Sequence, residues 1–522
     1  MWRASICVAG TLFALAWAGA QPAPSPSGTP FPVVGVKTGI DKSTGQPPAR
    51  LNINTLWARG GPQWDLFILA FAELQALDET NELSYFGITG IHGFPHSAWN
   101  GVCHVDGAPI TGFCPHGQVL VSHAAKIAVG YPPDIRTQYV TAVQTLRLPY
   151  WDWASDPTLP PAVYASKFTV RAPGGIVDVP NPLAGYQFQR PAVKAGFGGF
   201  LATFPQTIRC LGEGGMLSNI TASNERMTAA AQDITGSVYD IFARPKPLAS
   251  TSSRISDFEF PHNLVHALAV CNGTLSDLNC MLHHCNVDRL VAMWQAINYN
   301  ESMYTGTAYS TGQYATVKNT PITAASPLKP FFDEHVTFYT SGSVSNTTSF
   351  GYTYPEIPNS DMPPDSRAGH VRARVNSLYG GGDNGLGQMR TNEMDLPAML
   401  RLVVDGSVVG RWSLLAMPPD GVAQTSMPLQ DVSIGNRSIR DIDPAEVILF
   451  LEKHMTTEIR RSDGTQISPA SVPSLQIHVQ SMEYMPRADD SSFPSLGNAT
   501  DWPVRGAAVA RPRAPPSATV MG

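Results

Sequence analysis

Charge, cysteine and long hydrophobic runs are all scarce in this sequence, and each shortage excludes a class of protein. Only 15% of the 522 residues are charged, the net charge is −6 and no basic run occurs, so nucleic acid is not expected as a partner. No stretch reaches about 18 unbroken apolar residues, so no membrane-spanning helix is expected. Seven cysteines are too few for a disulfide scaffold in a chain of this length.

The residues that are abundant indicate a folded chain with more than one domain. Hydrophobic residues make up 43% of the sequence, which suffices for a core, and the length favours two domains over one. Glycine and proline number 45 each, which predicts much loop and argues against a plain helical bundle throughout.

The first twenty residues are typical of a secretory signal. Arg3 is followed by an apolar run over 6–17 and by the small triplet at 18–20, which predicts cleavage before Gln21. A buried N-terminal helix is the alternative. Six Asn-x-Ser/Thr sites suit a secreted glycoprotein: Asn219, Asn272, Asn300, Asn346, Asn436 and Asn498. We therefore expect a secreted protein that keeps six cysteines after cleavage.

Hydrophobic periodicity divides the rest of the chain into a helical part and a β part. Apolar residues at three- and four-residue spacings predict helices over 63–79, 121–130, 138–147, 257–270 and 282–298. Alternating or apolar runs predict strands over 400–404, 408–415, 447–451, 456–460 and 475–480, the first two forming a hairpin around Asp405-Gly406. The predicted units are a signal peptide 1–20, a helical domain 21–360, a linker 361–390, a β-sandwich domain 391–485 and a loose tail 486–522.

Histidines gather in two clusters, five of the 13 in 92–123 and four in 262–284. His262 and His266 stand four apart on one predicted helix, so their rings share a face, and His284 on the next helix could supply a third nitrogen. Three imidazoles without a carboxylate suit copper or zinc. Ordinary core or surface histidines are the alternative.

Two segments resemble the second copper-binding motif of the tyrosinase and catechol oxidase family. They are Phe-Pro-His-Asn-Leu-Val-His at 260–266 and His-His-Cys-Asn-Val-Asp-Arg at 283–289. Supporting motifs are Gly-Ile-His-Gly at 90–93, Cys-Pro-His at 114–116, Leu-Pro-Tyr-Trp-Asp-Trp at 148–153 and Gly-Tyr-Thr-Tyr-Pro at 351–355. The sequence is thus identified as a member of this type-3 copper family, with a fungal-like build.

The resemblance implies a mainly α fold: a four-helix bundle with long loops, holding two copper ions by three histidines each, followed by a smaller C-terminal β-sandwich that shields the site until it is cleaved off near 356–385. It implies oxidation of monophenols or o-diphenols to o-quinones by dioxygen, used in pigment formation or in tailoring a phenolic metabolite. The expected partners are a small phenolic substrate and dioxygen. The sequence does not indicate an oligomeric state.

By the same resemblance, His262, His266 and His284 are the ligands of copper B. His283 is then expected to orient its neighbours, and Asp288 with Arg289 to fix the helix by hydrogen bonds and an ion pair.

Copper A departs from the family pattern. The resemblance assigns it His92 and His116, with a thioether between Cys114 and His116; a Cys103–Cys114 disulfide is the alternative. The third ligand belongs to a Trp-His-Arg segment that is missing here, since 119–120 run straight into 121–127. His123, two turns after His116, is either a substitute or a surface histidine.

A second family segment, Asp-Pro-x-Phe, is missing between 280 and 281. Both losses fit either a mis-spliced gene prediction or a degenerate enzyme.

Glu259 and Asn263 resemble the residues that hold a water able to deprotonate a monophenol in tyrosinase-like proteins. A helix N-terminal role is the alternative for Glu259. Two other functions stay open: a copper- or oxygen-binding relative with an incomplete copper A site, and a zinc hydrolase built on the copper B histidines, although no His-Glu-x-x-His motif is present.

Overall fold

The structure is a computed structural model of the full chain. It describes residues 30–91, 98–102, 116–190, 204–212, 217–243, 255–271, 279–302, 306–310, 315–359, 361–380, 384–390, 394, 398–414, 422–429, 432–435, 437–439, 442–461, 465–481, 484–497 and 500–504. The descriptions that follow concern these residues.

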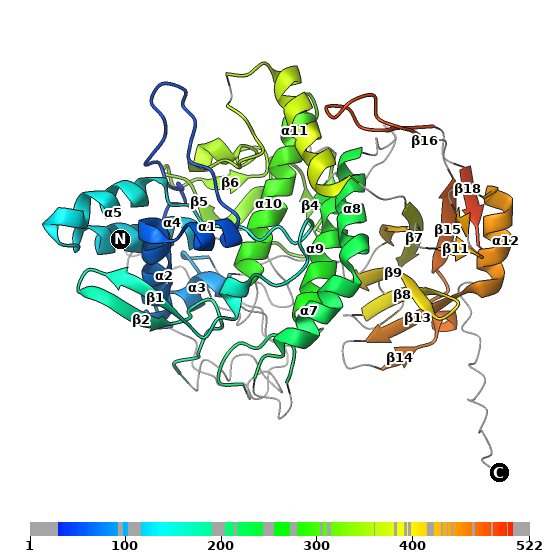
Figure 1. The fold of residues 1–522 in the computed structure, drawn as a ribbon, viewed down its shortest axis with the longest axis horizontal. Helices are drawn as coiled ribbons and strands as arrows, with labels where there is room; N and C mark the ends of the chain where they lie inside the picture. Colours follow the sequence, from blue (N-terminus) through cyan, green and yellow to red (C-terminus); the bar gives the residue numbers. More distant parts are fainter. Residues whose placement is uncertain are drawn as a thin grey trace, which may run out of the picture.

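Helices dominate the chain as far as residue 380 (Figure 1). They are α1 (Ile53–Arg59), α2 (Gly61–Ala76), α3 (Tyr85–Gly90), α4 (His116–Val129), α5 (Pro133–Thr145), α7 (Ile220–Ala229), α8 (Ala231–Ala243), α9 (Ile255–Ala269), α10 (Asn279–Ile297) and α11 (Pro364–Tyr379). Three antiparallel pairs lie among them: β1 (Lys167–Ala172) with β2 (Gly175–Pro180), β3 (Ala308–Tyr309) with β4 (Pro321–Ile322), and β5 (Pro327–Phe332) with β6 (Phe338–Thr340). The five predicted helices coincide with α2, α4, α5, α9 and α10.

The helices pack in neighbouring groups around one apolar core. α2 lies against α4 and α5, while α10 lies against α9 and α11. In α2 the proline of the first turn presets the helical backbone, and apolar residues at three- and four-residue spacings, Trp64, Phe67 and Phe71 among them, are buried. The pair α9–α10 carries both segments that the sequence singled out for copper B.

Strands prevail after residue 383 (Figure 1). One four-stranded antiparallel sheet has the order β10–β7–β15–β18, from β7 (Asn384–Arg390), β10 (Val422–Pro428), β15 (Gln476–Ser481) and β18 (Thr500–Pro503). The other has the order β14–β13–β8–β9, from β8 (Ala398–Val404), β9 (Ser407–Leu414), β13 (Met455–Arg461) and β14 (Gln466–Ile467). Two short pairs complete the described strands: β11 (Ser433–Ile434) with β12 (Arg437–Ser438), and β16 (Tyr484–Met485) with β17 (Ser495–Leu496).

The β8–β9 hairpin forms where the sequence predicts it. Val404 pairs with Ser407, so two residues make the turn, and both have positive φ, 48° at Asp405 and 84° at Gly406. Such two-residue turns match the twist of the flanking strands and favour Asp-Gly. The strands predicted over 456–460 and 475–480 are likewise confirmed as β13 and β15.

The strand predicted over 447–451 is wrong, because this segment lies in α12 (Pro444–His454). The Asp443 carboxylate caps the helix by accepting from the Ala445 N–H, and Pro444 occupies the first turn. Lys453 and His454 lie in the last turn, where positive charge complements the helix dipole. These end signals outweigh the apolar run.

The expected linker and tail also need correction. The linker range 361–390 contains α11, whose Val371 and Val375 are fully buried, and β7. The tail range 486–522 contains β18, paired with β15, and the Asp490 and Ser492 carbonyls accept hydrogen bonds from the Asn376 side chain. Long-range pairing of this kind leaves no trace in local composition.

A disulfide joins Cys210 to Cys271, immediately after the end of α9, with the two Cα atoms 4.9 Å apart. Sequence reasoning did not find this pair. None of the described helices combines the length and the apolar composition that crossing a membrane requires.

Candidate metal centre

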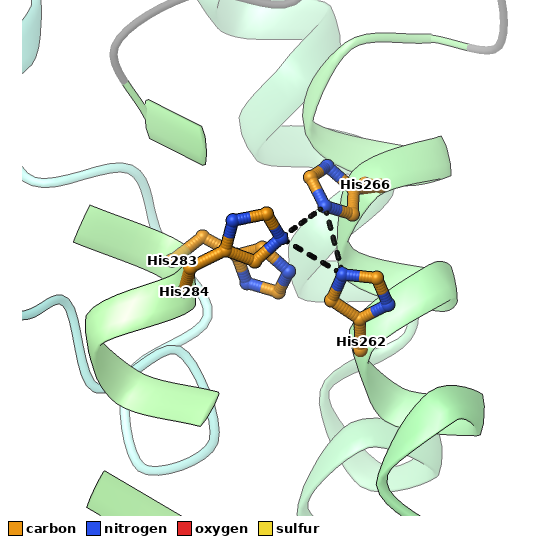
Figure 2. A group of neighbouring side chains, drawn as sticks. All are labelled: His262, His266, His283 and His284. Atoms are coloured by element: carbon orange, nitrogen blue, oxygen red, sulfur yellow. Dashed lines mark hydrogen bonds between the residues drawn. The ribbon is translucent and has the colours of Figure 1, made fainter. Parts of the chain in front are cut away.

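Four histidines from two neighbouring helices converge on one point (Figure 2). α9 contributes His262 and His266, and α10 contributes His283 and His284. Each ring offers one nitrogen, and the four nitrogens lie within 4.8 Å of one another. The i,i+4 spacing in α9 puts the first two rings on one face, as the sequence predicts.

Three of these nitrogens form a nearly equilateral triangle (Figure 2). The Nε2 of His262 lies 2.9 Å from that of His284, and the Nε2 of His266 lies 3.1 Å from each. Three ring nitrogens at this spacing cannot all pair with one another, since a neutral imidazole nitrogen either donates or accepts.

A single cation fits this triangle better than hydrogen bonds do. Imidazole nitrogens bind zinc at about 2.0–2.1 Å, which sets two such nitrogens about 3.3 Å apart at a tetrahedral angle, close to the observed separations. Neutral imidazole suits copper and zinc, and the cluster contains no carboxylate. The donor set therefore fits copper, and by itself does not separate copper from zinc.

The other nitrogen of His262 faces polar groups on its own helix. Its Nδ1 lies 2.8 Å from the Asn263 Oδ1 and 3.5 Å from the Glu259 Oε2. A proton held on Nδ1 by these oxygens leaves Nε2 free to bind a metal. Loss of hydration raises the pKa of Glu259, but the hydrogen bond with His262 opposes this, and the net pKa lies below the ordinary value.

His283 is buried behind the triangle rather than in it. His283 is only 2% exposed, and its ring stacks on the His262 ring with the two centroids 5.1 Å apart. The Trp153 indole N–H points at the His283 carbonyl at 3.5 Å, and the Trp151 N–H donates to the Leu282 carbonyl at 3.1 Å. The 148–153 segment thus supports α10 where its two histidines stand.

Arg289 anchors the same helix in a site without access to water. Its guanidinium is 1% exposed and donates to both Glu356 oxygens, at 2.8 and 3.0 Å, and lies 3.1 Å from an Asp152 oxygen. The Tyr379 hydroxyl lies 2.9 Å from Arg289 and donates to Asp152 at 3.0 Å. Burial raises the pKa of Glu356, but Arg289 lowers it by more, and the net shift is downward.

Asp288 is held from a different direction. The Tyr352 hydroxyl donates to its carboxylate at 2.9 Å, the Tyr354 hydroxyl donates to it as well, and Arg50 lies 3.4 Å away. Tyr354 also lies 2.9 Å from the Cys285 carbonyl. The predicted anchoring of this helix by hydrogen bonds and ion pairs is confirmed, while Arg50 and Glu356 were not found from the sequence, because no motif marks them.

Of the residues expected at copper A, the structure describes His116 and His123. His116 begins α4, is 3% exposed and lies with its Nε2 3.3 Å from the Thr89 hydroxyl. His123 points to α2, where its Nδ1 lies 3.1 Å from the Glu73 carboxylate. His92, Cys103 and Cys114 lie outside the described residues, and with them the thioether and the disulfide alternative.

Comparisons with known proteins agree on one family. Residues 82–297 match the common central domain of tyrosinase. A tyrosinase of Podospora anserina is 30% identical over 75% of this chain and 76% of its own length, and polyphenol oxidase 3 of Agaricus bisporus is 24% identical over 67% of each. Recombinant mushroom tyrosinase has a similar fold, with a TM-score of 0.75 at 18% identity over 90% of this chain and 98% of its own. The apo-protyrosinase of Aspergillus oryzae has a TM-score of 0.67 at 18% identity over 92% and 98%.

The Arg289 site yields a test by an isosteric change. Glu356→Gln keeps the shape but removes one charge from a buried pair, so the free energy of unfolding at pH 7 should fall by about 2–4 kcal/mol. The exposed counterpart Glu446→Gln, which breaks a surface pair with Arg437, should cost less than about 1 kcal/mol. Urea unfolding measures both.

The same variant makes a pH prediction. The folded-state pKa of Glu356 lies below the ordinary value of 4.5, so its contribution is present above that value and is lost as the pH falls through the folded pKa. The difference between wild type and Glu356→Gln should therefore shrink as the pH drops from 5 toward 3. A constant difference would show that the carboxylate charge contributes nothing.

Proposed function

This chain belongs to the tyrosinase family of type-3 copper proteins and is a tyrosinase-like copper oxidoreductase, and from that premise we propose that it oxidises monophenols, o-diphenols or both to o-quinones with dioxygen. The observation that carries this proposal is the convergence of three Nε2 atoms between α9 and α10. Pigment formation and tailoring of a phenolic metabolite are the uses we propose.

We assign copper B to His262, His266 and His284, with His283 packed behind them as a positioning residue. Copper supplies, when bound, the redox chemistry that activates dioxygen. The three neutral imidazoles hold the ion without adding charge, and the buried ion pairs at Arg289 fix the helix that carries two of the four rings.

Copper A is proposed at His92 and His116, with Cys114 joined to His116 by a thioether. The third ligand expected from the family is missing from the sequence. We propose that His123 is a surface histidine rather than a substitute ligand; its Nδ1 faces Glu73, a contact that by itself leaves its Nε2 open to a metal. Family membership favours the oxidising enzyme over a non-catalytic relative that loads copper B alone.

Copper stoichiometry tests these assignments. We expect two copper ions per chain in the wild type, about one fewer in His284→Ala together with loss of phenol oxidation, and no change in His123→Ala. Atomic absorption on chains loaded with copper and then desalted gives the numbers. One ion per wild-type chain would overturn the two-copper assignment, and a loss in His123→Ala would make His123 a ligand.

Glu259 and Asn263 are proposed to position the water that deprotonates a monophenol. The Glu259 side chain is 62% exposed, so its carboxylate is open to solvent while one oxygen faces the Nδ1 of His262. The phenolic proton would pass to the water and a proton of the water to the Glu259 carboxylate, which leaves the substrate as a phenolate. A glutamate carboxylate is ionised at neutral pH and is therefore able to accept the proton.

Glu259→Gln separates this role from simple support of His262. A positioned base contributes about 10²–10⁴-fold, so turnover of monophenols should fall by that order while turnover of diphenols, which need less help in losing a proton, falls far less. Glu73→Gln, remote from the cluster on α2, is the matched control and should alter neither rate. An equal loss on both substrates would limit Glu259 to orienting His262.

We further propose that the chain is secreted with residues 1–20 as its signal, glycosylated, and divided into a copper-binding four-helix-bundle domain over 21–360 and a C-terminal β-sandwich domain that, with β7 and β18, extends beyond the predicted range 391–485. The β domain is proposed to shield the copper site. Its strand β9 packs on α9, the helix of His262 and His266, and Arg411 of β9 lies 2.8 Å from Asp233 of α8.

Cleavage between α11 and β7 tests the shielding. A protease site substituted at 381–383 should give a several-fold rise in diphenol turnover after cutting, because the β domain is then no longer tethered. The unaltered chain, incubated with the same protease, is the control. Unchanged turnover of the fully cut chain would argue against a shield.

A further inference from the structure

Three arginines lie on one face of the sheet of β14, β13, β8 and β9: Arg460 on β13, Arg401 on β8 and Arg411 on β9. Arg401 of β8 stands directly opposite Arg411 of β9 on one side and Glu458 of β13 on the other. Directly opposed residues have Cβ atoms about 4.5–5.5 Å apart and share one face of the sheet. Arg460 follows Glu458 by two positions on β13, so it belongs to that same face.

This face meets the corner between α7 and α8 through Arg411. Arg411 reaches Asp233 in the first turn of α8, where the two charged atoms are 2.8 Å apart and the Asp233 side chain is only 6% exposed. Arg226 lies in the last turn of α7 and is near enough for its charge to act on Arg401. The four arginines therefore lie at the seam between the helices and the β part.

Among the described residues, this seam has fewer carboxylates than guanidinium groups. Asp233 is paired with Arg411, and Glu458 lies 3.8 Å from Arg460, so two described acids face four arginines. Within the part of the chain that the structure describes, the Nε atoms of Arg401 and Arg460 are covered and have no hydrogen-bond partner, although the Arg460 side chain as a whole is 44% exposed. Buried donors of this kind normally have an acceptor.

The environment of Arg401 is correspondingly unfavourable for its charge. Burial, followed by the positive charges of Arg411 and Arg460, lowers the pKa of Arg401, and Glu458 offsets this only in part. Arg401 is half-buried, so water screens an anion beside its guanidinium less than it would beside a fully exposed arginine.

We propose that Arg401 and Arg460, assisted by Arg226, bind a doubly charged oxyanion of the phosphate class at this seam. The planar guanidinium offers parallel N–H groups that match two oxygens of a phosphate, and the two unmet donors are of this type. Two negative charges also balance the excess of two positive charges counted above. The anion then links the β8–β9–β13 sheet to the α7–α8 corner, whatever the redox activity of the protein.

Calorimetric titration of the full-length, copper-loaded chain with inorganic phosphate at pH 7 and constant ionic strength tests the site. We expect one phosphate per chain with a dissociation constant of about 0.1–1 mM. Arg401→Gln should weaken binding at least about tenfold, while Arg437→Gln, which removes an exposed arginine elsewhere on the β part, should leave it unchanged. A second titration with glycerol 2-phosphate distinguishes two kinds of site: one that also binds phosphate monoesters and one that binds only the free phosphate ion.

Folding of the variant is not expected to obscure the result. Removing a charge that its neighbours repel should leave the midpoint of thermal unfolding without phosphate equal to or above that of the wild type. If Arg401→Gln nonetheless fails to fold, Arg460→Gln serves in its place, with the same loss of affinity expected. Absence of saturable phosphate binding to the wild type, or unchanged affinity in the folded variant, would overturn the proposal.

Discussion

Arg289 stands five residues after His284 on α10, and its guanidinium is shared by Asp152 and Glu356 in a site that water does not reach. Burying three charged groups is costly, and the cost is offset only while all three are present and hydrogen-bonded. That requirement fixes the rotation of α10 about its axis and its position along that axis, relative to the segments that carry Asp152 and Glu356. The position of the His284 ring depends on it, because the imidazole can reach the α9 histidines only from one setting of its helix.

The segments that hold α10 are the ones that carry motifs without metal ligands. Trp151 and Trp153 bond to its backbone beside the histidines, and Tyr352 and Tyr354 bond to Asp288 one turn further on. Each contact joins residues more than sixty positions apart. These motifs therefore belong to the metal centre through the helix that they position, which explains why aromatic and tyrosine-rich segments accompany the histidines in the sequence.

Local rules predict only what local spacing determines. The shared face of His262 and His266 follows from helical geometry, and the β8–β9 hairpin follows from Asp405-Gly406, so both could be predicted. The partner of Arg289 could not, because nothing near Glu356 marks it as a buried acid. The strand predicted over 447–451 was wrong because a short apolar run fits a strand as well as a helix. Only the helix-end signals at Asp443 and Lys453 distinguish the two, and they lie outside the run itself.

The surroundings of the fully buried Arg289 and the half-buried Arg401 shift the pKa of the same side chain in opposite directions. Burial alone lowers the pKa of Arg289, but Tyr379, Asp152 and Glu356 reverse the shift and raise it well above the ordinary value. At Arg401 burial again lowers the pKa, the charges of Arg411 and Arg460 lower it further, and Glu458 offsets only part of the shift. The first guanidinium has its counter-charges built into the fold and acts as an anchor. The second has a charge that the described residues balance only in part, and this imbalance is the physical basis for the anion proposed at the seam.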